Sequence, residues 1–505
     1  MFSVIYALLA FPLLTLTYAQ QIPLLHPQPD TWNSTLNPAS LNFTNTGITS
    51  SNQTANLALT LNFERSNWAF SSIALDDFYT SIPSNATTLP PGSILKVQAF
   101  TNTTTYTLPP NVALSRIMYT TQNLRNETVP ASAFVLWPFL PLSSAEYPGL
   151  SNPNPSINST KFPVVAWAHG TSGIFAECGP SHIRNLWYQY SAPFTAALAG
   201  YVVVGVDYQG LGVNTTSNGT GIPHPYLTVP AGANDLIYAV QAAQAAFPSK
   251  LSKEFVVMGH SQGGGAAWGT AVREATNPTV GYLGTIASSP TTNLTGEIAL
   301  HADVVPPTLG FFWAEAIRTL YPNFNQSQIL TDEGLARLRL AKEQGMCNSA
   351  VGALLSDFPG SDNGTILRKG WNTLPEIAKY LSLCDVGTQM IKGPMLMLQG
   401  TEDPAVPYLF TDASVATTCA AMGNGTRWSG IEYARFEGVS HVPVLFAGQR
   451  VWLEWLAERF GGVGKSEGGS GCVVRNYTSM AMPAANYQKE LGYFLELATQ
   501  AYQVA

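Results

Sequence analysis

Charged residues are scarce in this sequence. Asp, Glu, Lys and Arg make up 11% of its 505 residues, whereas roughly 25% is usual for soluble proteins. The net charge of -7 excludes a strongly basic surface, so we do not expect nucleic acid as a partner. Hydrophobic residues, at 46%, are sufficient for a substantial interior. Large α/β proteins of this length often form one elaborated core.

Long apolar runs are also missing beyond the N-terminus. No later segment reaches about 18 uninterrupted apolar residues, the length that a membrane-spanning helix needs, so stable membrane insertion is not expected. Residues 2–18 are apolar but short, and they run into the small-x-small pattern Thr17-Tyr18-Ala19. This pattern predicts a secretory signal peptide at 1–19 and an extracellular mature chain, with an uncleaved anchor as the alternative.

Cysteine is rare as well. The five cysteines include no Cys-x-x-Cys pair, so we do not expect a metal site. In an oxidising compartment they are expected to form two disulfides and to leave one free thiol. Because spacing does not define connectivity, the pairs Cys419–Cys472 and Cys178–Cys347 are a hypothesis.

Asn-x-Ser/Thr sequons, by contrast, are abundant. The sequence contains fourteen of them, from Asn33 to Asn476. Sugars on the surface would explain how a protein with so few charges stays soluble, so we predict a glycoprotein.

Buried strands alternate with helices in much of the chain. Residues 164–168 and 201–206 are continuous apolar runs, which are typical of strands covered on both faces. Residues 233–247 have apolar positions at helical spacing. Two further buried strands, 395–398 and 431–436, are predicted late in the chain. This alternation predicts an α/β fold with a doubly wound, mostly parallel sheet.

Between about 295 and 390 the strand rhythm stops and helical patterns dominate. One apolar stripe is formed by Leu309, Phe312, Trp313, Ala316 and Leu320. A second helix is expected to begin after Thr331 and to end at Gly345. This segment is either a helical insert packed on the core or a lid whose stripe faces a substrate site and a lipid interface, and the two are compatible.

These patterns divide the chain as follows. An extension rich in Asn, Thr and Ser covers 20–70, and the alternation at 57–63 within it predicts a half-exposed strand. The core is expected at 71–294 and 391–505, and the helical cap at 295–390.

The run Gly259-His260-Ser261-Gln262-Gly263 is a GxSxG sequence between a strand and a helix. The preceding strand is predicted at 255–258, and small residues at 263–267 allow a helix to begin close against it. A serine at such a tight turn has a strained backbone and an exposed hydroxyl. Ser261 is therefore the candidate nucleophile.

A serine hydroxyl needs a base within hydrogen-bond reach and an acid that orients the base. Hydrolases with this elbow have the chain order Ser, acid, His. Only His301 and His441 follow Ser261. His301 leaves room for only Glu274 and Glu297 as acids and comes before the late strands, so we favour His441.

The acid is expected just past the strand at 395–398. Asp403 lies there, and its role is to fix the tautomer of His441 and to stabilise the imidazolium. Glu402, one residue away, is the competing carboxylate. Three further acids in the helical segment rank lower, namely Asp357, Asp362 and Asp385.

A tetrahedral oxyanion needs two hydrogen-bond donors. The backbone N–H of Gln262, directly after the nucleophile, is expected to be one. The loop His169-Gly170-Thr171 follows an early strand, and we favour the N–H of Thr171 as the second donor, with Gly170 as the alternative. This loop could equally be a strand exit and no more.

Several motifs together resemble the fungal and bacterial secretory lipases of the Candida lipase A type, over roughly residues 75–460. They are Asp77-x-Tyr79, Pro91-Gly92-Ser93-Ile94-Leu95, His169-Gly170-Thr171, Val206-Asp207-Tyr208-Gln209-Gly210-Leu211-Gly212, the GxSxG run and Gly400-x-x-Asp403-x-x-Val406-Pro407. The resemblance implies an α/β-hydrolase fold with a helical cap between nucleophile and acid, no cofactor, and hydrolysis of carboxylic esters, including acylglycerols. It carries the triad over onto Ser261, Asp403 and His441.

The sequence departs from that family in two places. Its first 70 residues have no recognised counterpart, and the elbow reads His-Ser-Gln where many members have Tyr-Ser-Gly. Substrate preference therefore stays open.

We thus predict a secreted serine hydrolase of the lipase or esterase type, which cleaves small-molecule or lipid esters through an acyl-enzyme. Phe311, Phe312 and Trp313 are expected to line the acyl pocket, and contact with a lipid interface would be transient. The alternatives are a serine exopeptidase, an acyltransferase, or a non-catalytic module on the same fold.

Overall fold

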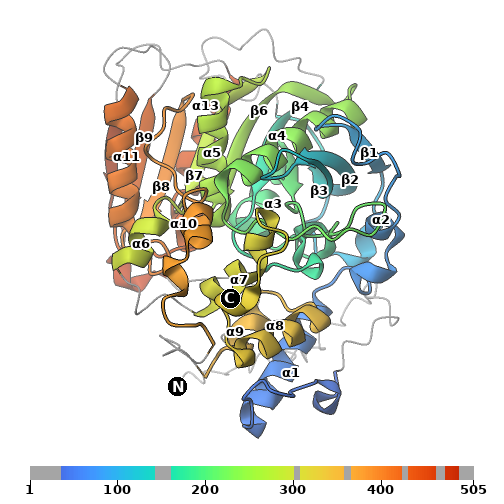
Figure 1. Ribbon diagram of the computed structural model, residues 1–505. Coiled ribbons are helices and arrows are strands. Elements are labelled where there is room, and N and C mark those ends of the chain that lie inside the picture. The colour runs from blue at the N-terminus through green and yellow to red at the C-terminus, as the bar shows by residue number, and fades with distance from the viewer. Residues whose placement is uncertain are drawn as a thin grey trace, which may run out of the picture.

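A central sheet with helices on both faces organises the computed structural model (Figure 1). The structure describes residues 36–142, 161–300, 307–357, 366–422, 430–461 and 472–487. The predicted signal peptide at 1–19 lies outside these residues.

The described residues form a ten-stranded sheet in the order β1-β2-β3-β5-β4-β6-β7-β8-β9-β10. Three antiparallel pairs join β1, β2, β3 and β5 at one edge, and every other pair is parallel. The strands are β1 (Ile94–Gln98), β2 (Ala113–Gln122), β3 (Thr128–Trp137), β4 (Phe162–Ala168), β5 (Val202–Val206), β6 (Leu251–His260), β7 (Tyr282–Ser288), β8 (Met395–Gly400), β9 (Ile431–Phe436) and β10 (Val473–Tyr477). The prediction of a mostly parallel sheet is confirmed.

Each face of the sheet has its own apolar core, because successive side chains of a strand point to opposite faces. In β6, Phe255 and Val257 join the core that contains residues of α4, α5 and α11. Val256 and Met258 join the core that contains residues of α3, α12 and α13. These helices are α3 (Pro193–Leu198), α4 (Val229–Ala246), α5 (Gln262–Thr276), α11 (Tyr408–Met422), α12 (Pro443–Ala447) and α13 (Gln449–Phe460). The sheet is therefore doubly wound.

Helices fill the chain between β7 and β8, as the sequence predicts. They are α6 (Leu294–Leu300), α7 (Pro307–Ala316), α8 (Asp332–Gln344), α9 (Asn348–Leu354) and α10 (Pro375–Leu381). The Thr331 side chain accepts a hydrogen bond from the N–H of Gly334 at 3.1 Å, and Gly345 ends α8 at φ 62°. Both predicted ends of this helix are confirmed. A short helix, α2 (Asp77–Thr80), precedes the sheet.

The predicted strand at 57–63 is wrong, because these residues lie within helix α1 (Ser51–Ser66). A strand would place residues 57, 59 and 61 on one face, but Leu57 and Leu61 are buried while Leu59 is 50% exposed. Positions 57 and 61 are four residues apart and therefore also share one face of a helix. The Ser50 side chain caps the helix by accepting from the N–H of Gln53. The apolar positions fit both the two-residue period of a strand and the four-residue spacing of a helix. The Ser50 cap and the packing of α1 on α9 favour the helix.

Two disulfides link segments that are distant in sequence. Cys178 is bonded to Cys347 and Cys419 to Cys472, which are the predicted pairs. Cys384 is the buried free cysteine. Because Cys347 lies directly before α9, the first disulfide joins the helical segment to the chain that follows β4.

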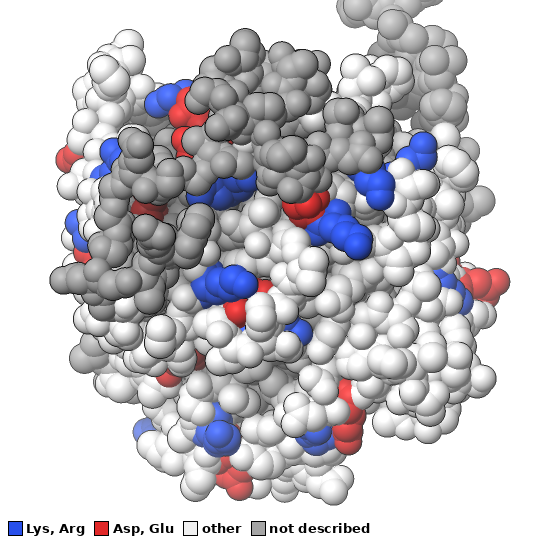
Figure 2. Space-filling model, turned by 90° about the horizontal axis from the view of Figure 1, so that it is seen from above, with Lys and Arg blue, Asp and Glu red and all other residues white. Residues whose placement is uncertain are grey.

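The surface is poor in charge. On the face in Figure 2, Lys and Arg are scattered among Asp and Glu on a mostly uncharged background. No helix in the described part of the chain is both long and apolar enough to span a membrane.

Candidate active site

Ser261 lies at the turn between β6 and α5, with φ 58° and ψ -121°. A positive φ is costly for a residue with a side chain, so the surroundings must hold it. The N–H of Ser261 donates to the carbonyl of Ser288 at 3.0 Å, and its own carbonyl accepts from the N–H of Gly265 at 3.1 Å. The strained elbow that the sequence predicts is present.

Glycines allow the helix of the elbow to begin against the sheet. A Cβ at Gly259 would overlap the carbonyl oxygen of Gly263, and a Cβ at Gly263 would overlap that of Ala168. Larger residues at these positions would push α5 away from β4 and β6, and the turn at Ser261 would open.

His441 and Asp403 meet where β9 and β8 end. The Nδ1 atom of His441 lies 2.7 Å from Oδ2 of Asp403, and both side chains are buried. The other carboxylate oxygen of Asp403 accepts the N–H groups of Ala405 and Val406 at 2.9 and 2.8 Å. The Nε2 atom of Gln399 donates to Oδ2 at 3.1 Å.

These contacts keep Asp403 ionised. Burial alone would raise the pKa of its carboxyl, but the neighbouring His441, together with the hydrogen bonds it receives, lowers that pKa below the ordinary value. An ionised Asp403 accepts a hydrogen bond from the N–H at Nδ1 of His441, and this leaves Nε2 unprotonated and able to accept a proton from elsewhere.

His260 joins the elbow to the loop of His441. Its Nε2 atom lies 3.1 Å from the backbone carbonyl of His441, and its Nδ1 atom lies 2.6 Å from the hydroxyl of Tyr188. A carbonyl can only accept, so Nε2 carries the hydrogen and Nδ1 accepts from the phenol. Burial, reinforced by the nearby His441, lowers the pKa of His260 to about 3, so the ring is neutral. The two imidazole rings are 4.5 Å apart.

The predicted oxyanion loop lies beside Ser261, the candidate nucleophile. A Cβ on Gly170 would be 3.1 Å from Cβ of Ser261 and would overlap the Tyr188 hydroxyl. Burial raises the pKa of Tyr188, and a hydrogen bond from the backbone of Gly170 partly offsets this. The Thr171 hydroxyl lies 3.0 Å from that of Tyr226.

The side chain of Gln262 contacts the buried His224. Its Nε2 atom lies 3.0 Å from Nε2 of His224, whose Nδ1 atom lies 3.1 Å from the carbonyl of Gln209. Burial lowers the pKa of His224 to about 3. A neutral His224 that donates through Nδ1 accepts a hydrogen bond from the amide of Gln262 at Nε2, so the side chain of the residue after Ser261 is held in place.

The three aromatic residues predicted to line an acyl pocket are fully buried on α7. Phe312 packs edge-on against Tyr226 at 5.2 Å between ring centroids, and Trp313 lies 5.8 Å from Trp371. Phe311 belongs to the same apolar core. Through Tyr226, α7 is thus connected to the predicted oxyanion loop.

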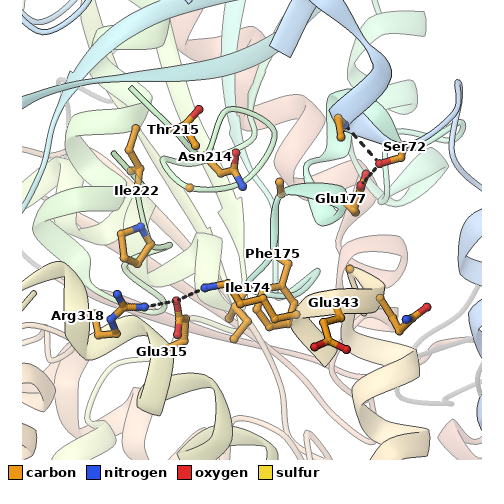
Figure 3. Close-up of a pocket in the computed structure, with 18 of the residues that line it drawn as sticks. Ser72, Ile174, Phe175, Glu177, Asn214, Thr215, Ile222, Glu315, Arg318 and Glu343 are labelled. Atoms are coloured by element: carbon orange, nitrogen blue, oxygen red, sulfur yellow. Dashed lines mark hydrogen bonds and ion pairs between the residues drawn. The ribbon is translucent and has the colours of Figure 1, made fainter. Parts of the chain in front are cut away.

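A cavity of about 810 Å³ lies between residues of α1, α7 and α8 and the loops after β4 and β5 (Figure 3). Its charges are largely paired: Glu315 contacts Arg318 at 3.0 Å and Lys342 at 3.6 Å, and Ser72 donates to Glu177. Of the described residues, those that line it do not include Ser261, Asp403 or His441.

The competing acids lie in other contacts. Asp357 pairs with Arg337 at 2.7 Å, and Asp385 accepts from the N–H of Thr295 at 3.2 Å. Asp362 and His301 lie outside the described residues.

Sequence reasoning missed the roles of three residues around the elbow, namely Tyr188, His224 and the ring of His260. His260 stands within the GxSxG run, so its position was visible, but its partners were not. Nothing in the local sequence marks Tyr188 or His224.

The fold and the elbow are those of the α/β-hydrolases. The family model of the secretory lipases matches residues 185–468, and the chain therefore belongs to the secretory lipase family. The predicted resemblance is thereby confirmed. A search of curated proteins finds no match.

Solved structures share the fold at low sequence identity. Candida antarctica lipase A in its closed state is 17% identical, with a TM-score of 0.59 over 78% of this chain and 87% of that one. Another structure of this lipase is also 17% identical, with a TM-score of 0.60 over 83% and 93%. The ligand-bound rice cell wall degrading esterase LipA from Xanthomonas oryzae is 17% identical, with a TM-score of 0.53 over 73% and 98%.

Proposed function

We propose that this protein is a secreted, glycosylated serine hydrolase that cleaves carboxylic esters with apolar acyl groups. The observation that carries the proposal is the 2.7 Å contact between His441 and an ionised Asp403, next to the strained elbow of Ser261. Membership of the secretory lipase family supports ester hydrolysis as the chemistry.

In the proposed reaction, the Ser261 oxygen attacks the ester carbonyl while Nε2 of His441 takes its proton. Asp403 holds the imidazole in the required tautomer and stabilises the imidazolium. The tetrahedral intermediate collapses, the C–O bond to the alcohol breaks, and His441 gives the proton to the departing oxygen. Water then attacks the acyl-enzyme in the same way and releases the acid.

The oxyanion is proposed to be bound by the backbone N–H groups of Gln262 and Thr171. The fixed side chain of Gln262 favours a rigid donor at that position. Gly170 is the weaker candidate, because its backbone hydrogen bond is directed to Tyr188.

We further propose that 295–390 is a cap over a core formed by 71–294 and 391–505. Helix α1 packs on α9, so part of the 20–70 extension would brace this cap (Figure 1). Phe311, Phe312 and Trp313 are fully buried, so they would meet the acyl chain, or a lipid surface, only if α7 moved.

The test uses p-nitrophenyl esters of increasing acyl length, with an aminoacyl arylamide as the comparison substrate. We expect ester hydrolysis, little amide cleavage, and loss of about 10⁶-fold in kcat for Ser261→Ala. Ser84→Ala, an exposed serine in a loop, is the matched control. Undiminished ester hydrolysis by Ser261→Ala rejects the mechanism, and preferential arylamide cleavage points to an exopeptidase. A wild-type protein that neither hydrolyses esters nor reacts with a fluorophosphonate is a non-catalytic module.

A further inference from the structure

We propose that His260 is a positioning residue that holds the main chain of the His441 loop against the nucleophile elbow, and that Tyr188 orients it. The inference rests on the proposed function, because it assigns His441 as the base. It concerns a contact between backbone and ring that the triad itself does not require.

Three separate segments converge on the ring of His260. The elbow supplies the ring itself, the loop after β9 supplies the His441 carbonyl at 3.1 Å, and the segment before α3 supplies the Tyr188 hydroxyl at 2.6 Å. The same hydroxyl receives the backbone hydrogen bond of Gly170. One chain of hydrogen bonds therefore runs from the oxyanion loop, across the elbow, to the base loop.

The direction of each bond in this chain is determined by its ends. The His441 carbonyl accepts from Nε2 of His260, so Nδ1 accepts from Tyr188, whose oxygen in turn accepts from Gly170. The His260 ring and the Tyr188 hydroxyl therefore each donate one hydrogen bond and accept one. The ring of His260 cannot flip without losing both of its bonds.

The ring must also stay neutral for this arrangement to work. The ionisable groups around His260 are Tyr188, His441 and Asp403, and burial is the largest influence on its pKa, which falls to about 3. A neutral ring 4.5 Å from His441 avoids like-charge repulsion when His441 becomes an imidazolium during each turnover.

Ordinary core packing would give a different result from positioning. A phenylalanine at 260 fills a similar volume but cannot donate to the His441 carbonyl. A glutamine places an amide N–H close to the position of Nε2, so it preserves that bond while losing the one to Tyr188. The variants His260→Phe, His260→Gln and Tyr188→Phe therefore separate the two roles. Tyr190→Phe, in the same loop with its ring against Phe194, is the matched control.

We measure kcat, KM, the rate of fluorophosphonate labelling and Tm for each variant. His260→Phe is expected to lose about 10- to 100-fold in kcat and in labelling rate, with KM unchanged, because the base is displaced by a fraction of an ångström. His260→Gln is expected to recover most of that loss. The kcat of Tyr188→Phe is expected to lie between those of His260→Phe and His260→Gln. The double variant Tyr188→Phe/His260→Phe is expected to lose no more activity than His260→Phe alone.

If His260→Phe and His260→Gln lose kcat equally, and the losses follow the decreases in Tm, the proposal is overturned in favour of packing. Wild-type kcat in folded Tyr188→Phe or His260→Phe overturns it as well. If His260→Phe does not fold, His260→Gln and Tyr188→Phe decide by the same criteria. An inactive Ser261→Ala beside a fully active His260→Phe rejects this inference alone, whereas an active Ser261→Ala rejects the proposed function.

Discussion

Nδ1 of His441 lies 2.7 Å from Oδ2 of Asp403, although the two residues are 38 positions apart in the sequence. The contact forms because β8 and β9 are parallel neighbours, so the loops that follow them emerge at the same edge of the sheet. Asp403 is fixed in turn by two backbone N–H groups of its own loop. The pair is thus built by sheet topology.

Asp403→Asn is expected to lower kcat for ester hydrolysis by about 10⁴-fold, because an amide can favour the wrong tautomer of His441. The matched control is Glu402→Gln, one residue earlier, which should retain near wild-type kcat. Steady-state kinetics on a p-nitrophenyl ester measures both. Comparable losses in the two variants would contradict the assignment of the acid.

Gly170→Ala is expected to lower kcat by about tenfold or more, since the added Cβ would displace the Tyr188 hydroxyl and crowd Ser261. Gly221→Ala is the control, because a Cβ there meets no atom within 4 Å. Tm should fall in Gly170→Ala, where the added Cβ overlaps a buried side chain, and change little in Gly221→Ala, so kinetics and thermal unfolding are measured together on the folded enzymes. A Gly170→Ala enzyme with wild-type kcat would show that the loop tolerates a side chain beside the nucleophile.

Removing the disulfide between Cys178 and Cys347 with a double alanine variant should reduce the free energy of unfolding by about 2–4 kcal/mol. The bond closes a loop of 169 residues and joins the helical segment to the chain after β4. Denaturant unfolding measures the change. Cys384→Ala, which removes the free thiol, is the control and should cost less. Equal stability of the double variant and wild type would mean that other contacts hold these segments together.

Glu64 makes the stability of α9 depend on pH. Its carboxylate oxygens accept the N–H groups of Cys347 and Ala350 at 2.9 and 2.8 Å, while burial raises its pKa from 4.5 to about 7. A raised folded-state pKa gives stability that is present below the unfolded pKa and is lost as pH rises through the folded one.

Wild type should therefore lose stability relative to Glu64→Gln as pH rises from about 4.5 to 7, by on the order of 3 kcal/mol at most. Comparing Tm of the two proteins at pH 5 and pH 8 isolates this group, since the other titrating groups are shared. A Tm difference that stays constant across this range would show that Glu64 is ionised throughout.

Much of the fold could be predicted because several central strands are continuous apolar runs. Residues 164–168 and 395–398 lie within observed strands, since burial on both faces leaves only apolar residues there. Residues 431–436 also form a strand, although Glu432 and Arg435 within it are only partly buried. The segment 57–63 failed because leucines two and four residues apart match a strand and a helix alike. Packing on α9 decides between them, and that contact is invisible locally.

The candidate site, like the fold, could be predicted from the sequence only in part. Chain order and loop position after a strand were sufficient to select Asp403 and His441, which the structure brings together. The contact of Tyr188 with His260 could not be predicted, because it joins the end of strand β6 to an irregular segment 72 positions earlier in the chain. Such contacts depend on how loops pack, and no periodic pattern in the sequence describes that.

The most direct test of the central claim is a crystal structure of the enzyme inactivated by an alkyl fluorophosphonate. We predict phosphorus bonded to Oγ of Ser261, Nε2 of His441 within about 3 Å of that oxygen, and the N–H groups of Gln262 and Thr171 about 2.7–3.1 Å from the phosphoryl oxygen. Attachment of the probe to another residue, or a His441 ring turned away from Ser261, would contradict the account.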